Sequence, residues 1–168
     1  MPETLTRVDP IVAEPQVFVG GTMVLEPAAK RYSLRGAAAD LQAFLPLPLP
    51  MRIGDISNGA AGLAVMLGPD EWLLIGELLA GGQGQPVSIT EITERQIGLL
   101  IEGPRAAELL MSGCPLDLER MPAGRGTRTI YETVELTILK LSETRFHVEV
   151  WRSFAPWLVA ALAQVAMD

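Results

Sequence analysis

Hydrophobic and polar residues alternate with a period of two over much of this chain, which predicts short β-strands. Gly68-Pro69-Asp70 joins two of these segments as a hairpin turn. We expect helices over residues 36–45 and 104–111, ended by Pro46 and by a left-handed cap at Gly113, and a flexible loop over 80–86. The pattern predicts an α+β fold with mostly antiparallel sheet and packed helices. The expected strands cover residues 30–35, 62–67, 71–76, 87–92, 96–102, 127–133, 134–141 and 145–151.

The last sixteen residues predict a helix that is apolar on every side. Ser153 is the expected N-terminal cap, and Pro156 falls in the first turn, where proline is tolerated. No charged residue occurs before Asp168, so the helix is expected to be buried on more than one side. Either another part of this chain or a second subunit covers the second side. One stripe holds Phe154, Trp157, Leu158, Ala161, Leu162 and Val165, and the opposite side holds Ala155, Val159, Ala160, Ala163, Gln164 and Ala166.

Protein–protein interfaces often contain large aromatic residues, and small residues on the outer side of a helix. Aromatic residues also occur in hydrophobic cores. Trp72 and Trp151 lie on or beside expected hairpin strands, and the small helical residues would let another element approach closely. The candidate partner interface therefore comprises Trp72, Trp151, Val159, Ala160, Ala163 and Ala166.

An internal repeat runs through most of the chain. Gly36 and Gly103 each follow an expected strand and precede an expected helix, and Pro48 and Pro115 follow those helices; both pairs are 67 positions apart. We therefore expect a duplicated strand–helix–hairpin module. Residues 30–168 would form a single α+β domain with two related halves, about 30–80 and 87–168. Residues 1–29 contain four prolines and no sustained period, which predicts an extended N-terminal arm, either frayed or wrapped around a partner.

Composition narrows the class of protein. The chain has 168 residues, of which 49% are hydrophobic and 20% charged, and its net charge of −7 argues against a nucleic-acid-binding protein. The single cysteine excludes an internal disulfide and fits a reducing compartment. The first residues lack the basic and apolar segments of a signal peptide, and no apolar run approaches the ~20 residues that span a bilayer. We expect a cytoplasmic protein with no membrane contact.

Candidate chemistry is sparse. His147 is the only histidine, and the alternation around it predicts a surface or interface position rather than a general base. Cys114 follows an expected helix and is interpreted as a small packed hydrophobic residue. The sequence predicts no catalytic, cofactor-binding or metal-binding residues, and it contains no nucleotide-binding glycine motif. Three arginines, Arg120, Arg125 and Arg128, are either an anion contact or solvated charge.

Six segments occur in a distinctive order along the chain: Leu67–Gly76, Arg95-Gln96, Gly103–Leu110, Gly113–Leu118, Thr127–Thr129 and Glu149–Trp157. Together they resemble the gamma subunit of heterotetrameric sarcosine oxidase. The resemblance implies a fold like the folate-binding domain of the glycine-cleavage aminomethyltransferase. It also implies a complex that oxidatively demethylates sarcosine to glycine and passes the one-carbon unit to tetrahydrofolate. FAD, FMN, NAD and tetrahydrofolate would belong to other subunits, and the partners would be the alpha, beta and delta subunits.

Two alternatives remain open at this point. The fold implied by the resemblance also allows a free-standing folate-binding protein in which Arg120, Arg125 or Arg128 meets the folate glutamate. The corresponding small subunit of an N-methylglutamate dehydrogenase-type complex would have a similar sequence. As a subunit, the chain is expected to self-associate when isolated or to need its partner to stay in solution.

Overall fold

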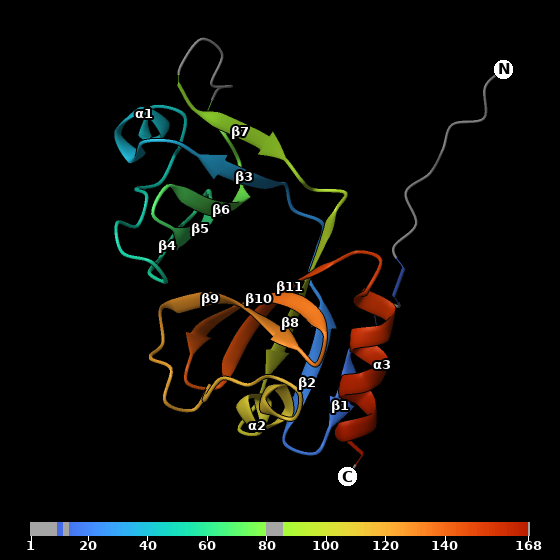
Figure 1. The fold of residues 1–168 in the computed structure, drawn as a ribbon. Helices are drawn as coiled ribbons and strands as arrows, with labels where there is room; N and C mark the ends of the chain where they lie inside the picture. The colour runs from blue at the N-terminus through green and yellow to red at the C-terminus, as the bar shows by residue number, and fades with distance from the viewer. Residues whose placement is uncertain (1–9, 12–13, 80–85, 168) are drawn as a thin grey trace, which may run out of the picture.

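The computed structural model describes residues 10–11, 14–79 and 86–167, and it contains two antiparallel sheets (Figure 1). The larger sheet has the strand order β1-β2-β8-β11-β10-β9 and the smaller sheet the order β4-β5-β6-β3-β7. Both sheets confirm the predicted α+β class with mostly antiparallel strands. The larger sheet comprises β1 (Gln16–Phe18), β2 (Gly21–Leu25), β8 (Gln96–Glu102), β9 (Arg125–Tyr131), β10 (Val134–Ser142) and β11 (Arg145–Trp151). The smaller comprises β3 (Arg31–Arg35), β4 (Ile56–Gly59), β5 (Gly62–Gly68), β6 (Glu71–Gly76) and β7 (Ser88–Glu91).

The duplication is visible in the strand order. The order β4-β5-β6-β3 in the smaller sheet repeats as β9-β10-β11-β8 in the larger one. Gly36 and Gly103 both leave their strand with a positive φ, 136° and 138°, which glycine adopts without strain. Each donates its N–H to the turn of its own hairpin, Gly36 to Asp70 O at 3.2 Å and Gly103 to Thr144 O at 2.9 Å. Helices α1 (Ala38–Gln42) and α2 (Ala106–Met111) follow these glycines.

The two halves exchange one strand each. β7 precedes β8 in the chain but pairs with β3, and β2 precedes β3 but pairs with β8, where Thr22 faces Glu102. Residues 16–25 therefore form a hairpin in the larger sheet instead of the expected extended arm. The turn is possible because Gly20 has a φ of 85°. Residues 1–9 and 12–13 of the predicted arm, and most of the predicted 80–86 loop, lie outside the described residues.

Three clusters of buried hydrophobic residues hold the fold together. The largest lies between the larger sheet, α2 and α3 (Ala155–Val165), and includes Ile101, Phe146 and Leu158. A second lies between the smaller sheet and α1 and includes Trp72. The third joins the halves, because Val65, Leu73 and Ile75 of the smaller sheet pack with Leu139 of the larger sheet. Both faces of the larger sheet are consequently covered near its centre.

Two predicted helix caps are wrong. The N-cap of α3 is Phe154 rather than Ser153, and no side chain caps it, although Pro156 does lie in the first turn as predicted. Gly113 does not have a positive φ and so does not form the predicted left-handed cap. A different need explains this glycine: a Cβ there would lie 2.7 Å from the ring of Tyr131.

Candidate functional site

A buried group of charged side chains lies where the two halves meet. The Arg31 guanidinium on β3 donates from Nε to Glu149 Oε2 on β11 at 2.7 Å. His147 lies between two carboxylates, with Nε2 2.7 Å from Glu149 Oε1 and Nδ1 2.8 Å from Glu26 Oε2. Gly98 leaves room for the group, because a Cβ at this position would lie 2.7 Å from Arg31 Nη2. We call Glu26, Arg31, His147 and Glu149 the junction cluster.

The charges of the junction cluster balance. Burial by itself would lower the pKa of His147, but its hydrogen bonds and attraction to Glu149 and Glu26 outweigh burial and raise the pKa to about 9. Burial would raise the pKa of Glu149, but His147 and Arg31 hold it below its ordinary value; the pKa of Glu26 is lowered in the same way. At neutral pH two positive and two negative charges are therefore present, and the cluster is electrically neutral.

The predicted surface position of His147 is wrong, since the residue is only 4% exposed. The alternation along β11 correctly places Phe146, Val148 and Val150 in one core, but the opposite face of this strand packs against the other half of the molecule. His147 and Glu149 both lie on that second face and are buried with Arg31. The charged groups of the cluster pair with one another, and the cluster joins the two halves.

A polar cleft of about 350 Å³ opens between the two sheets next to this junction. Glu71 on β6 lies in it. Its carboxylate forms an ion pair with Arg35 at 3.0 Å and accepts a hydrogen bond from Arg128 on β9 at 2.6 Å. At its rim the guanidinium of Arg95 stacks over the Trp151 ring, with its central carbon 4.0 Å from the ring centroid. Glu71 thus bridges the halves, while Arg95 and Trp151 form a pair on the outside.

The three candidate anion-binding arginines do not converge on one point. Arg120 is a solvated side chain, 89% exposed, with Asp117 at 3.4 Å. Arg125 pairs with Asp55 across the junction and donates to Ile53 O at 2.8 Å. Arg128 binds Glu71. Each guanidinium therefore has a carboxylate partner within this chain, and the geometry favours structural charge over a shared anion site.

The candidate interface residues fall into two groups. Trp72 is only 2% exposed and donates from Nε1 to Pro50 O at 2.8 Å, so it belongs to the core of the first half and has almost no surface to offer a partner. Val159 and Ala166 pack against the larger core, and Val159 lines a small cavity together with Met23 and Leu25 of β2. Part of the second side of α3 therefore packs against the core of the same chain.

The remaining candidates offer more surface. Trp151 is 37% exposed and Ala160 is exposed, whereas Ala163 is half-buried. Two aromatic residues of the predicted apolar stripe are also partly exposed, Phe154 at the N-cap of α3 (44%) and Trp157 in its first turn (39%). Arg95 was not among the sequence candidates, because nothing in its neighbourhood along the chain indicates that it stacks on a tryptophan 56 positions later.

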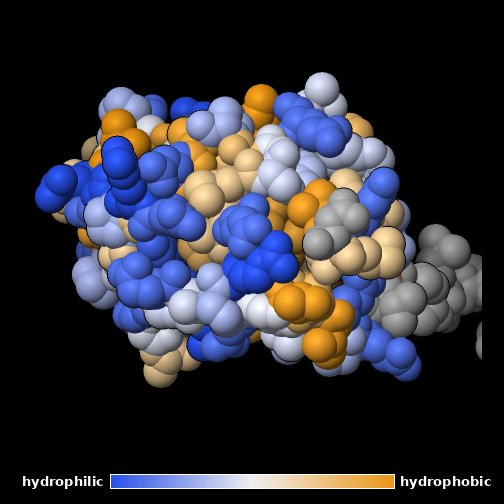
Figure 2. All heavy atoms as spheres, turned by 90° about the horizontal axis from the view of Figure 1, so that it is seen from below, coloured by the Kyte–Doolittle hydropathy of each residue, from blue (hydrophilic) through white to orange (hydrophobic). Residues whose placement is uncertain are grey.

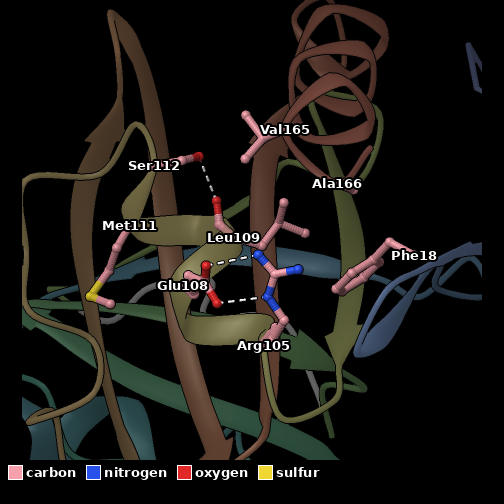
Figure 3. Close-up of a pocket in the computed structure, with 8 residues that line it drawn as sticks. All are labelled: Phe18, Arg105, Glu108, Leu109, Met111, Ser112, Val165 and Ala166. Carbon is pink, nitrogen blue, oxygen red and sulfur yellow. Dashed lines mark hydrogen bonds and ion pairs between the residues drawn. The ribbon is translucent and has the colours of Figure 1, made fainter. Parts of the chain in front are cut away.

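An apolar groove of about 330 Å³ lies at the far end of α3 (Figure 3). Phe18, Leu109 and Val165 line it, and the ion pair between Arg105 and Glu108, 2.7 Å long, crosses its edge. Figure 2 views the molecule from below, and on that face hydrophilic side chains divide the hydrophobic surface into separate small areas. The charges at the groove are satisfied by each other.

Cys114 is buried, as predicted, with its Sγ 3.7 Å from Thr129 Oγ1. In the described part of the chain, no three histidine, cysteine, aspartate or glutamate residues gather as a metal site. None of its helices has the length and apolar character to cross a membrane.

Comparisons with known proteins agree with this architecture. No family model matches the chain. Sarcosine oxidase subunit gamma of Arthrobacter sp. is 30% identical over 143 residues, which is 76% of this chain and 70% of the relative. The same subunit of Corynebacterium sp. strain U-96 is 30% identical over 141 residues, covering 75% and 69% of the two chains.

Solved structures extend the comparison to the fold. A chain of heterotetrameric sarcosine oxidase from Corynebacterium sp. U-96, solved in complex with pyrrole 2-carboxylate, has a TM-score of 0.77 at 26% identity, covering 93% of this chain and 90% of that one. The glycine cleavage system aminomethyltransferase T of Bartonella henselae shares the fold, with a TM-score of 0.64 at 17% identity over 83% of this chain and 44% of that one. The identity over most of both sequences and the matching fold show that the chain belongs to the family of sarcosine oxidase gamma subunits.

Proposed function

We propose that this chain is the small, non-catalytic subunit of a heterotetrameric sarcosine oxidase and that it contributes to assembly and stability of the complex. The observation that carries the proposal is the match to a chain of such a complex over nearly the full length of both. The relatives reported above favour neither the free-standing folate-binding protein nor the N-methylglutamate dehydrogenase subunit.

The titratable groups support a structural role. Arg31, His147 and Glu149 are buried and bound to one another, so they present no free acid, base or cation to a substrate. Arg125 and Arg128 are held by Asp55 and Glu71. These side chains are used to join the two halves of the chain, which is what a rigid assembly module requires.

The chemistry of the complex would then take place in its other subunits. On this proposal the alpha, beta and delta subunits hold FAD, FMN, NAD and tetrahydrofolate and oxidatively demethylate sarcosine to glycine. We place the complex in the cytoplasm, and the single thiol, buried at Cys114, is compatible with that reducing compartment.

Co-expression tests the proposal. The chain is produced with its partner subunits, one of which is tagged, and the complex is analysed by size-exclusion chromatography and by sarcosine-dependent oxygen consumption. We expect the chain to co-elute in stoichiometric amount and its omission to lower the yield and thermal stability of the active complex. A chain that elutes alone as a monomer, together with a complex unaffected by its omission, would contradict the proposal.

A further inference from the structure

The end of β11 and the start of α3 carry three partly exposed aromatic side chains within seven residues. Trp151, Phe154 and Trp157 are 37%, 44% and 39% exposed. Their positions are fixed by the fold: Phe154 N–H bonds to Trp151 O at 2.8 Å, and the ring of Trp157 packs edge-on against Tyr131 with centroids 6.2 Å apart. Rigid aromatic residues of this kind lose little entropy on binding and frequently dominate interfaces.

The aromatic surface continues along the outer side of α3. Trp157, Ala160, Gln164 and Met167 follow one another at helical spacing and are all exposed. No charged residue occurs from Ser153 to Met167. Covering this strip with another protein would therefore bury no charge, which removes the main cost of burying a helix surface.

The cation Arg95 lies at the end of the strip, next to Arg152. Arg95 is exposed and stacks on Trp151, and the backbone holds the two segments together through Arg152 N–H and Arg95 O at 2.8 Å. Within the described residues no carboxylate forms an ion pair with its guanidinium, in contrast to Arg35, Arg125 and Arg128. A stacked guanidinium still has donors at its edge for a carboxylate.

We propose that the surface formed by Arg95, Trp151, Phe154, Trp157 and Ala160, here called the aromatic face, docks a partner subunit of the sarcosine oxidase complex. The partner supplies an apolar surface against the aromatic rings and α3, and a carboxylate that pairs with Arg95. This inference rests on the proposed function and names its contact surface. It is favoured over the groove at the other end of α3, where Arg105 and Glu108 already satisfy each other.

The test uses two charge-introducing variants with matched controls, in the complex co-expressed with a tagged partner subunit. Ala160→Glu places a carboxylate in the uncharged strip, and Ala123→Glu makes the same change in an exposed loop between α2 and β9. Arg95→Glu reverses the charge of the stacked arginine, and Arg120→Glu makes the same reversal at a solvated arginine that is not among the residues of the proposed surface. We expect each test variant to weaken capture of the chain at least tenfold, and each control to assemble like the wild type.

The outcomes separate the two proposals. If the wild-type chain does not assemble, the proposed function fails. If the wild type assembles and Ala160→Glu assembles equally well, the aromatic face is overturned while the proposed function stands; normal assembly of Arg95→Glu overturns the carboxylate contact. Urea unfolding of each variant checks its fold. Should Ala160→Glu not fold, Gln164→Lys, one turn further along the exposed strip, gives the same decision.

Discussion

The junction cluster predicts an unusual loss of stability in mild alkali. The pKa of His147 rises from 6.5 to about 9 in the folded chain. At roughly 1.4 kcal/mol per pKa unit, its protonated form contributes about 3 kcal/mol to the free energy of unfolding. Because the folded pKa is the higher one, this contribution is complete below pH 6.5, declines as the pH rises, and is gone above about pH 9. On the acid side, the lowered pKa values of Glu26 and Glu149 cause stability to be lost as the pH falls below 4.5.

The variant His147→Gln measures the contribution of protonated His147 to the free energy of unfolding. The amide cannot carry the positive charge, so the variant leaves Glu26 and Glu149 with one cation fewer and should lose about 3 kcal/mol at pH 6.5. Equilibrium urea unfolding of both proteins from pH 6 to 10 measures the difference. It should shrink to less than about 1 kcal/mol by pH 9.5. Other groups that titrate in this range are common to both proteins and cancel. A difference that stays constant from pH 6 to 10 would refute the assignment of a charged, buried His147.

Three further predictions concern packing. Gly98→Ala should destabilise the fold by about 1–3 kcal/mol in urea unfolding because the new methyl group meets Arg31, whereas Gly59→Ala, with no atom within 4 Å, should change stability by less than about 0.5 kcal/mol. Leu139→Ala should cost about 2–5 kcal/mol, since Leu139 is fully buried between the sheets; a loss below about 1 kcal/mol in the same assay would mean that the halves are not packed there. The Cys114 thiol should react with iodoacetamide only after unfolding, and rapid labelling of the native chain, followed by mass spectrometry, would contradict its burial.

Local pattern was sufficient for most of the elements. The alternation over residues 145–151 and the Gly68-Pro69-Asp70 turn predicted β11 and the β5–β6 hairpin because both depend on neighbours in sequence. The 67-residue spacing of Gly36 and Gly103 revealed the duplication, since both glycines meet the same backbone requirement. Strands β1, β2 and β4 were missed because they are short and lie close to prolines and glycines.

Contacts between distant residues account for the errors at the candidate site. His147 was placed on the surface because alternation assumes that one face of a strand meets water, and here the second half covers that face. Trp72 was predicted to lie at a partner interface because nothing near it in the sequence indicates that its indole N–H bonds to Pro50 O in the core. The sequence allowed either this chain or a second subunit to cover the second side of α3; in the structure, Val159 and Ala166 of that side pack against the core of the same chain.

The exchange of strands between the halves also sets an order for synthesis on the ribosome. β2 leaves the ribosome early, but its partner β8 begins more than seventy residues later, and the aromatic face is completed only with α3, at the end of the described chain. Pairs this far apart form late, because a long loop must close before they contribute. Until β8 has been made, the β1–β2 hairpin therefore lacks the strand that pairs with its edge in the folded chain. A partner subunit that recognises the aromatic face would select chains that have finished folding over those that are only partly made.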